Sequence, residues 1–358
     1  MNACRGCGKT DLVRVLDLGT APAADHFPRV AELVCAAEMS HSLAMEVCRV
    51  CGLAQLADDD TIADEPRGVE PQALRDQAGA AIERVAAAGW LRGESVFEFG
   101  SPHGGTWIPL LAGRGFTPVK SEADVVLDCF GVMHEKDQRA AFDRRSQLIR
   151  PGGVLLLQYH SLMTIVRRGQ WNALRHGHFA YYSMTALTRL LSEVGLRAAT
   201  AWEFDLYGGT VLLAAVRENV HHDDVVDRIL ATEDEFGITD PDVVSDLQRR
   251  ADLHVKELRS WLESEAEAGR TVYAYGAASR AVALFSRAGL DSRLLAGVAD
   301  ASPAKQGRRM PGTDIPIVSP AELLAANPDR VLLTVPDLLP EVTMRFPELG
   351  GRWKVDGS

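Results

Sequence analysis

The sequence lacks any apolar run near the roughly 20 residues that a membrane-spanning helix needs. Its start, MNACRGCGKT, has no apolar signal segment, which favours a cytoplasmic protein. Positive charge is in deficit, because 38 Lys and Arg face 49 Asp and Glu, so we expect no nucleic-acid partner. With 358 residues, 46% of them hydrophobic, the chain is long enough for two or three globular domains.

Cysteine is scarce but unevenly placed. Four of the six cysteines form two C-x2-C pairs, each followed by glycine, and these are Cys4, Cys7, Cys48 and Cys51. In a reducing compartment such pairs are typical of metal ligands rather than disulfides. Two thiolate pairs supply the tetrahedral set of a closed structural zinc site. Four unrelated buried thiols are the alternative, and we expect Cys35 and Cys129, which lack ligand spacing, to be core residues.

Strands and helices alternate over most of the remaining chain. The patterns predict strands at 95–100, 123–132, 150–159 and 210–217, and helices at 73–90, 104–115, 137–149 and 183–195. A second strand–turn–helix unit occupies 271–290, with further strands at 294–300, 315–318 and 330–335. We therefore expect an α/β protein with four parts. These are a zinc-binding lobe at 1–58, an α/β lobe at 70–218, a helical connector at 220–269 and a second α/β lobe at 270–358.

The stretch LRHGHFAYYS at 174–183 places two histidines between a cation and several aromatic residues. Removing a proton from the carbon beside a ketone needs a base and a donor for the enolate oxygen. His178 is our candidate for the base, and Arg175 is a candidate for the enolate or phosphate clamp. Two alternatives stay open: both histidines are structural hydrogen-bonding groups, or His176 and His178 bind a metal.

Together, several motifs give the chain a resemblance over nearly its whole length to the sugar C-methyltransferases. They are the cysteine pairs with LDLGTAPAADHF, then HGHFAYYSMTAL, YGGT, YGAASR and DASPAKQGRRMPGTDIPI. That family methylates carbon 3 of nucleotide-linked 4-keto-6-deoxy sugars in antibiotic pathways. The resemblance implies a zinc-binding lobe, a methyltransferase-like Rossmann lobe and a C-terminal Rossmann-like lobe. It also implies an NDP-deoxysugar substrate.

The family binds S-adenosylmethionine (SAM) on the middle lobe, through an acid and glycines after the first strand. Glu98, Gly100 and Gly104 keep that frame in FEFGSPHGG, although a packed turn of no function would look the same. Only 24 residues separate Gly100 from Val125 in the next buried strand, too few for the usual strand and its ribose-binding acid. This lobe is therefore expected to be truncated and to bind SAM weakly.

The resemblance also implies further site residues. Arg175 and Gly177 replace the family's tyrosine and glutamate, while His176 and His178 remain. Tyr207 stands where the family has histidine in its His-Gly-Gly-Ser segment. In the C-terminal lobe the family docks the nucleotide diphosphate, which here implicates Tyr275, Arg280 and Lys305. Lys305 taken alone would be read as a solvated lysine.

These features predict an enzyme that deprotonates the carbon next to the keto group of an NDP-4-keto-deoxysugar. The weakened methyl-donor site favours a SAM-independent epimerase or isomerase. A genuine SAM-dependent sugar C-methyltransferase is the first alternative, and a catalytically dead escort subunit is the second. The identity of the sugar, the carbon acted upon and the oligomeric state stay open.

Overall fold

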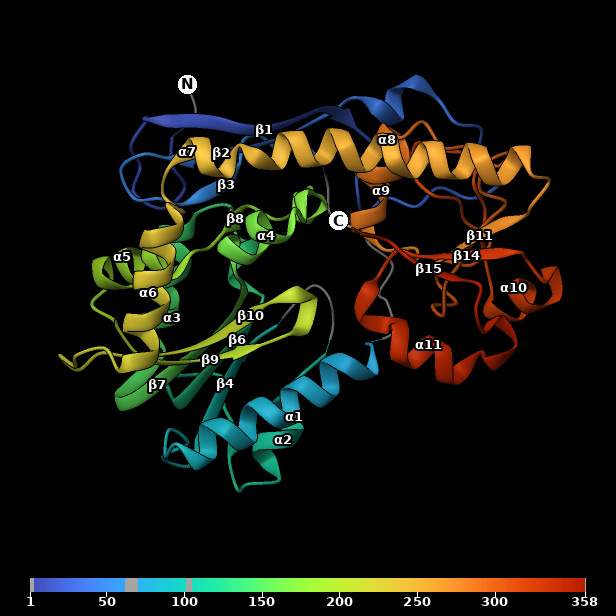
Figure 1. The fold of residues 1–358 in the computed structure, drawn as a ribbon. Coiled ribbons are helices and arrows are strands. Elements are labelled where there is room, and N and C mark those ends of the chain that lie inside the picture. Colours follow the sequence, from blue (N-terminus) through green and yellow to red (C-terminus); the bar gives the residue numbers. More distant parts are fainter. Residues whose placement is uncertain (1–2, 62–69, 101–104, 358) are drawn as a thin grey trace.

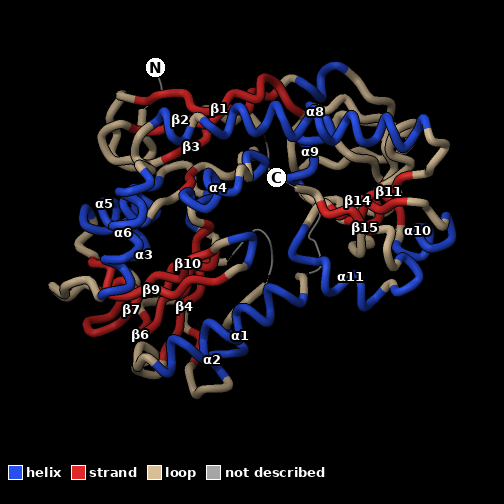
Figure 2. Tube along the Cα trace, viewed as in Figure 1, coloured by secondary structure: helices blue, strands red, loops and turns tan. Residues whose placement is uncertain are grey.

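The computed structural model describes residues 3–61, 70–100 and 105–357. Figure 1 shows two α/β bodies side by side, with the long helix α8 (Asp246–Glu267) and strand β1 (Leu12–Ala21) running along the top of both. Within these ranges no helix is both long and apolar enough to cross a membrane. The architecture is therefore the expected α/β fold, in three sheets that Figure 2 shows in red.

The middle sheet has six strands in the order β5-β4-β6-β7-β10-β9. Its parallel strands are β4 (Ser95–Phe99), β5 (Thr117–Pro118), β6 (Ala123–Cys129) and β7 (Ile149–His160). β10 (Thr210–Val216) runs antiparallel between β7 and β9 (Arg197–Phe204). The carboxyl ends of β4, β6 and β7 thus meet at one edge of the sheet, where open α/β sheets bind ligands.

Helices cover both faces of this sheet, which explains its almost continuous apolar strands. One face packs under α1 (Gln72–Ala87) and α2 (Ile108–Ala112). The other face packs under α3 (Gln138–Gln147), α5 (Met184–Glu193) and α6 (Asp224–Phe236). Successive residues of β7 point to opposite faces of the sheet. Leu156 lies in the cluster under α1 and α2, and Leu157 lies in the cluster under α3, α5 and α6.

The outer edge of the middle sheet is short. β5 has two residues, and in the described parts of the chain no strand pairs with its far side. The two acids that follow it do not reach the carboxyl ends of the strands. Asp124 lies at the start of β6, where its carboxylate accepts hydrogen bonds from the N–H groups of Glu94 and Ser95. Glu122 directly precedes that strand and is exposed.

The N-terminal sheet joins distant parts of the chain. It is antiparallel, in the order β1-β2-β3-β8, with β2 (His41–Cys48), β3 (Ala54–Leu56) and β8 (Ala180–Tyr181). β8 lies within the histidine stretch 174–183, two residues after His178, so pairing with β3 fixes this stretch to the N-terminal sheet. The cluster that buries β1 also contains α4 (Leu162–Arg168), α8 and the C-terminal lobe. The predicted boundary at residue 58 therefore does not separate two hydrophobic cores.

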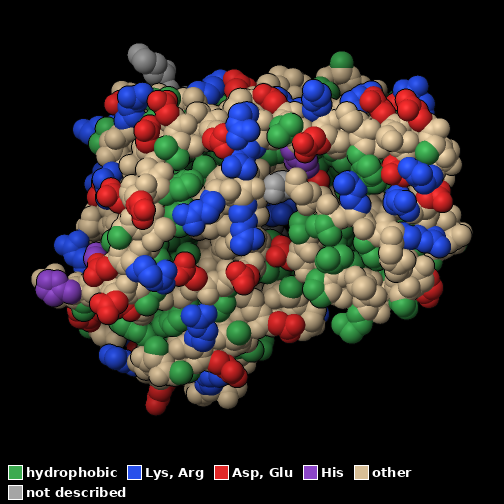
Figure 3. Space-filling view, in the orientation of Figure 1, with side chains coloured by type: hydrophobic (Ala, Val, Ile, Leu, Met, Phe, Trp, Pro, Cys, Tyr) green, Lys and Arg blue, Asp and Glu red, His purple; other side chains and the backbone are tan. Residues whose placement is uncertain are grey.

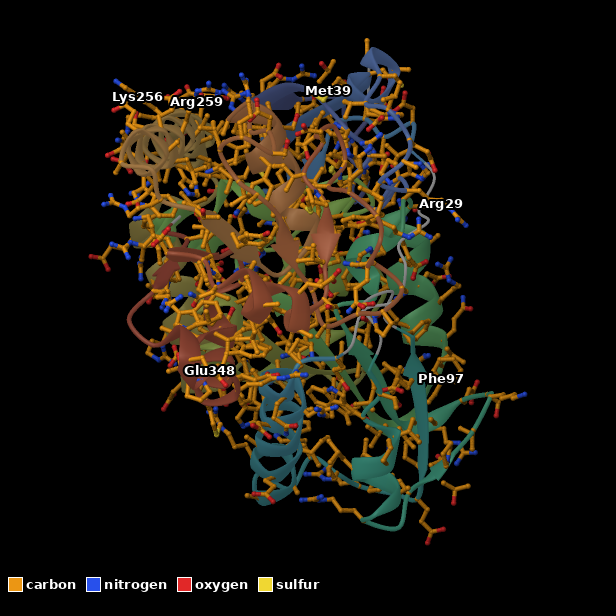
Figure 4. All side chains as sticks on the ribbon, turned by 90° about the vertical axis from the view of Figure 1, so that its right-hand side faces the viewer. Arg29, Met39, Phe97, Lys256, Arg259 and Glu348 are labelled. Atoms are coloured by element: carbon orange, nitrogen blue, oxygen red, sulfur yellow. The ribbon has the colours of Figure 1, made fainter. Side chains whose placement is uncertain are left out.

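The segment between β1 and β2 docks on the C-terminal lobe, which was not foreseen. It carries the short helix η1 (Ala36–Met39), and Arg29 forms an isolated antiparallel bridge with Arg308. The Sδ atom of Met39 lies 3.2 Å from the hydroxyl of Ser286, and Figure 4 labels both Arg29 and Met39. Cys35 is exposed in this segment, so its expected place in the core is wrong. Other residues of this segment hold it to the C-terminal lobe, and the Cys35 side chain is left in solvent.

The C-terminal sheet is wholly parallel, in the order β13-β12-β11-β14-β15. Its strands are β11 (Val272–Tyr275), β12 (Val298–Ala299), β13 (Ile317–Val318), β14 (Arg330–Leu333) and β15 (Trp353–Val355). Its helices are α9 (Ser279–Arg287), α10 (Pro320–Ala326) and α11 (Leu339–Arg345).

The predicted connector is confirmed as helix and is itself part of the core. Asp240 caps α7 (Pro241–Val244) by accepting a hydrogen bond from the N–H of Asp242, and α8 follows. The apolar face of α8 is buried against β1 and β11. The remaining short helices are η2 (Val132–His134), η3 (Trp171–Ala173), η4 (Leu206–Gly208), η5 (Pro336–Leu338) and η6 (Pro347–Leu349).

Candidate functional site

The four predicted zinc ligands converge. The Sγ atoms of Cys4, Cys7, Cys48 and Cys51 all lie within 4.8 Å of one another. The Cys4–Cys51 and Cys7–Cys48 sulfur pairs are 3.5 and 3.6 Å apart. A tetrahedron with Zn–S bonds of about 2.3 Å requires S–S distances of about 3.8 Å, so the residues fit a zinc ion. Four thiol ligands leave no open position for chemistry, which makes the site structural.

The thiols of this cluster have pKa values shifted in opposite directions. A hydrogen bond from Cys51 lowers the pKa of Cys4 to about 5, whereas burial raises the pKa of Cys7 to about 11. Four thiolates packed this closely need a cation to ionise together, and Zn²⁺ supplies that charge. The sulfurs are also packed into the apolar cluster of the middle sheet, so the metal would tie the N-terminal strands to that sheet.

One cavity of about 410 Å³ lies where the middle and C-terminal lobes meet. Its lining includes residues from the carboxyl ends of β4, β6 and β7, from the histidine loop and from the turn after β11. Among the predicted site residues, the cavity contacts Glu98, Arg175, His178, Tyr207, Tyr275, Arg280 and Lys305. Positive and negative side chains are interspersed on the outer face that Figure 3 shows, so this face presents no patch of one charge.

The histidine loop divides its two histidines. His178 lines the cavity, and its Nε2 accepts a hydrogen bond from Nε of Arg175 at 2.8 Å. The guanidinium of Arg175 also donates to the hydroxyl of Ser279, at the start of α9. Arg175 therefore connects the loop with the C-terminal lobe. The ring of His134 stands edge-on to His178, 4.5 Å between centroids, and burial lowers the pKa of His134 to about 3.

His176 does not belong to the cavity lining, which corrects its predicted catalytic place. Its Nε2 lies 3.1 Å from the carbonyl oxygen of Ser42 in β2, and 2% of the residue is exposed. Residues two apart in an extended chain would point to the same side, but the chain turns at Gly177, whose φ is +79°, and this turn sends the two histidines in different directions. The backbone N–H of Gly177 donates to the carboxylate of Asp59, which holds this turn. The two histidines therefore do not form a shared metal site.

Two cavity residues have unusual backbone conformations. Phe130, after β6, has φ +62°, and Tyr207 has φ +54°, although neither is glycine. Such conformations cost free energy and tend to occur at functional sites. Their rings meet edge-on with centroids 6.1 Å apart, and the guanidinium carbon of Arg280 lies 5.5 Å from the Tyr207 ring centroid. Burial raises the pKa of Tyr207, so its hydroxyl stays neutral and can donate a hydrogen bond.

Two cations lie beside the turn after β11, Arg280 in α9 and Lys305 in the loop after β12. Gly276 has φ +98°, and a Cβ there would come within 2.8 Å of the Thr334 hydroxyl, so this position requires glycine. Nζ of Lys305 donates to the carbonyl oxygen of Ala277 at 2.9 Å. Lys305 is 5% exposed and packs over the ring of Phe27, so it is not a solvated lysine. Burial lowers the pKa of Arg280, but a guanidinium stays protonated at neutral pH.

The residues predicted for the methyl donor are only partly assembled. Glu98 lines the cavity, but its carboxylate accepts hydrogen bonds from the N–H of Trp107, at 2.6 Å, and from the hydroxyl of Thr106. Gly100 follows β4 and is not among the residues that line the cavity. Gly104 lies outside the described residues. Glu98 therefore holds Thr106 and Trp107, which directly precede α2, next to the end of β4.

Several cavity residues were not singled out from the sequence. They are Gln77, Phe130, His134, Tyr159, His160 and Asp300. Cys129 also lines the cavity and is half-buried. His160 had a usable signal, because it ends a predicted strand, where α/β sheets place ligand-binding residues. Asp300 likewise directly follows β12, and its carboxylate accepts a hydrogen bond from the N–H of Ala277 at 2.8 Å.

Comparison with known proteins gives a relative of nearly full length. C-methyltransferase NovU from Streptomyces niveus is 26% identical over 406 residues, covering 99% of this chain and 95% of that protein. The aligned 406 positions exceed the 358 residues of this chain by 48, so at least that many positions of the alignment are empty here. The shortened middle lobe is consistent with this difference.

Solved structures with a partial likeness include magnesium protoporphyrin IX methyltransferase (ChlM) from Synechocystis PCC 6803 with bound SAM. It is 13% identical, with a TM-score of 0.31, over 41% of this chain and 80% of that one. N-methyltransferase NodS from Bradyrhizobium japonicum WM9 is 14% identical, with a TM-score of 0.28, over 41% of this chain and 98% of that one. Likenesses this distant carry no argument about the site.

Two family models match separate parts of the chain. The model described as "C-methyltransferase C-terminal domain" matches residues 205–355. The model described as "Putative zinc binding domain" matches residues 4–61, which include all four cysteines of the metal cluster. Together with the relative that aligns over nearly the whole length, these matches show that the chain is similar to C-methyltransferases both in its zinc-binding lobe and in its C-terminal part.

Proposed function

We propose that this C-methyltransferase relative acts on a nucleotide-linked 4-keto-deoxysugar and moves a proton at the carbon next to the keto group without a methyl donor. The observation that carries the proposal is the shared cavity. Arg280 and Lys305 line it from one lobe, and His178, Arg175 and Tyr207 line it from elements of the other. A cavity of about 410 Å³ lies within the usual range for one small-molecule ligand, roughly 300–1,000 Å³.

The chain's own groups suit each part of such a substrate. Cations beside a glycine turn bind the diphosphate, because charge-assisted hydrogen bonds to phosphate are strong. An imidazole in the cavity takes the carbon-bound proton, and His178 is the group predicted from the sequence for this role. The hydroxyl of Tyr207 or the guanidinium of Arg175 donates to the oxygen on which the enolate charge develops.

The methyl donor is the weaker part of the site. SAM, when bound, supplies an electrophilic methyl group. Its ribose usually meets an acid after the second strand, but Glu122 and Asp124 lie toward the amino ends of the strands, away from the cavity. The carboxylate of Glu98 is engaged by Thr106 and Trp107. A genuine SAM-dependent methyltransferase is the second candidate, which the similarity to C-methyltransferases and the position of Glu98 in the cavity wall favour.

SAM is expected to bind with a dissociation constant of about 1 mM or weaker, equivalent to about −4 kcal/mol. Isothermal titration calorimetry measures this directly. A titration of the same preparation with a nucleoside diphosphate is the control that the cavity is intact. Micromolar SAM affinity, together with a mass gain of one methyl group on a ketosugar, would establish the methyltransferase instead.

In heavy water the enzyme is expected to exchange a ring proton of a nucleotide-linked 4-keto-6-deoxyhexose for deuterium. Proton abstraction by a positioned base is worth about 10²–10⁴ in rate. Proton NMR follows the loss of the signal and the appearance of any epimer. If dTDP- and UDP-linked ketosugars show neither exchange nor turnover, the protein is an escort subunit rather than an enzyme.

Arg280→Ala is expected to weaken binding of a nucleoside-diphosphate sugar at least about tenfold, the worth of one charge-assisted contact. The matched control is Arg293→Ala, which removes the same charge from the same lobe, where the side chain is 88% exposed. Calorimetry on both variants measures the two affinities. Equal affinity in the two variants would place the diphosphate elsewhere.

A further inference from the structure

His160 lines the cavity, is not a zinc ligand, and has so far been given no structural role. It is the last residue of β7, pairs in register with Thr210 of β10, and lines the cavity. The carboxyl end of a parallel strand is where an open α/β sheet presents groups to its ligand. The position of His160 is therefore that of a ligand-facing residue.

Its surroundings bring together the groups that proton transfer needs. The His160 ring lies 6.3 Å from the ring of Tyr207, centroid to centroid, and Arg280 lies over that same tyrosine. Burial, followed by the charge of Arg280, lowers the pKa of His160 to about 3, and Arg168 adds to this. Gln170 and the backbone of Tyr207 act in the opposite direction. His160 is therefore a neutral imidazole at neutral pH.

The hydrogen-bonding capacity of the His160 imidazole is not fully used. Within the described part of the chain, Nε2 of His160 and Oε1 of Gln170 are both buried and make no hydrogen bond of good geometry, although Gln170 lies close enough to raise the pKa of His160. The amide Nε2 of Gln170 donates to the carbonyl oxygen of Tyr207 at 3.0 Å, which leaves Oε1 as an acceptor for an imidazole N–H. A hydrogen bond from Nε2 of His160 to Oε1 of Gln170 would keep the hydrogen on Nε2 and leave the lone pair on Nδ1. Unpaired buried polar atoms are rare and call for a ligand or a role.

His178 is placed differently. Its Nε2 lone pair already accepts a hydrogen bond from Arg175, and a proton taken there would create an imidazolium beside a guanidinium. Its contact orients Arg175, which in turn reaches Ser279 on the other lobe. This geometry suits a residue that positions the cation better than one that accepts a proton.

We infer that His160 is the base that removes the carbon-bound proton, with Gln170 as its positioning residue and His178 as the anchor of Arg175. The inference rests on the proposed function. The C–H bond breaks, its electron pair forms the C=C bond of the enolate, and the carbonyl oxygen takes the negative charge. The proton moves to Nδ1 of His160. Return of a proton to the carbon completes the cycle, so no oxidant or reductant is needed.

The substrate would strengthen this base. A diphosphate bound at Arg280 offsets the positive charge that disfavours an imidazolium at His160. The hydroxyl of Tyr207, held neutral by burial, is the adjacent donor for the enolate oxygen. Proton abstraction is thereby coupled to the presence of the nucleotide diphosphate.

The test compares deuterium exchange into dTDP- and UDP-linked 4-keto-6-deoxyglucose by the wild type and by three matched variants. These are His160→Gln, His178→Gln and His222→Gln; the last histidine lies outside the cavity lining, with Nδ1 2.9 Å from the carbonyl oxygen of Ala198. His160→Gln is expected to lose at least about a hundredfold in exchange rate. Its affinity for the nucleoside diphosphate and its zinc content should stay near wild type. His222→Gln should exchange normally.

A His160→Ala variant assayed with added imidazole separates chemistry from folding, because free imidazole should restore part of the exchange. His178→Gln is expected to weaken substrate binding more than it slows exchange at saturation. Wild-type exchange in His160→Gln, or a loss confined to His178→Gln, would overturn the assignment and leave the proposed function standing. A wild-type enzyme that exchanges nothing would instead overturn the proposed function itself.

Discussion

Cys48→Ser is expected to remove about one equivalent of zinc per chain and to lower the melting temperature by about 5 °C or more. Loss of a structural metal is among the few single changes that cost above about 4 kcal/mol, and each kcal/mol is worth about 1.3 °C in a chain of 358 residues. Cys48 is fully buried, and it shares an apolar cluster with α3, α5 and the middle sheet. The damage should therefore spread beyond the N-terminal strands. Elemental analysis and scanning calorimetry measure both effects.

Cys35→Ser is the matched control for this experiment. Cys35 is exposed and is not part of the four-sulfur cluster, so the same chemical change should leave zinc content and melting temperature unaltered. A Cys48→Ser protein that keeps a full equivalent of zinc, or wild-type protein that folds without metal, would contradict the structural zinc site.

Glu38→Gln is expected to destabilise the chain by about 3–5 kcal/mol, the usual cost of breaking one side of a buried ion pair. Arg309 is 1% exposed and donates to both carboxylate oxygens of Glu38, at 2.8 and 2.5 Å. It also donates to the carbonyl oxygens of Glu32 and Leu33. This pair fastens the segment between β1 and β2 to the C-terminal lobe. Urea denaturation measures the free energy of unfolding.

The same pair predicts a pH dependence. The hydrogen bond from Arg309 lowers the pKa of Glu38 below its usual range. A carboxylate with a lowered folded-state pKa contributes stability above its unfolded value of about 4.3, and this is lost as the pH falls through the folded value. Glu38→Gln should therefore lose less stability than wild type between about pH 5 and acid unfolding.

Glu263→Gln is the control for this pair, because its partner Arg259 and Glu263 itself are both nearly half exposed on α8. Exposed pairs of this kind are worth at most about 1 kcal/mol. Equal effects of Glu38→Gln and Glu263→Gln would show that the contact between the β1–β2 segment and the C-terminal lobe contributes little.

Much of the fold could be predicted because it depends on neighbouring residues. The two C-x2-C-Gly turns predicted the metal cluster, since ligand spacing within a turn is local. The cap at Asp240 and the apolar face of α8 followed from helical periodicity. The strands that became β4, β6, β7 and β10 were recognisable because both faces of that sheet are covered by helices. Strand β9 was missed, because its alanines and polar residues give no continuous apolar run.

The site could be predicted only in part, for a geometric reason. His176 and His178 look alike in the sequence, but β2 covers one and the cavity receives the other. His160, Phe130 and Tyr207 lie far apart along the chain, and their neighbourhood exists only once β6, β7 and β10 align in one sheet. The left-handed backbone at Phe130 and Tyr207 has no sequence signal, since glycine is the residue that usually marks it.

By itself the sequence determined the four zinc ligands, the order of the principal strands and helices, and the resemblance to the C-methyltransferases. Each depends on spacing within a short stretch or on motifs read one after another. Only the tertiary structure decided which side chains share the cavity, that the segment between β1 and β2 belongs to the C-terminal lobe, and that Cys35 is exposed. Those outcomes depend on contacts between residues hundreds of positions apart, such as Glu38 with Arg309, and packing rather than local spacing sets them.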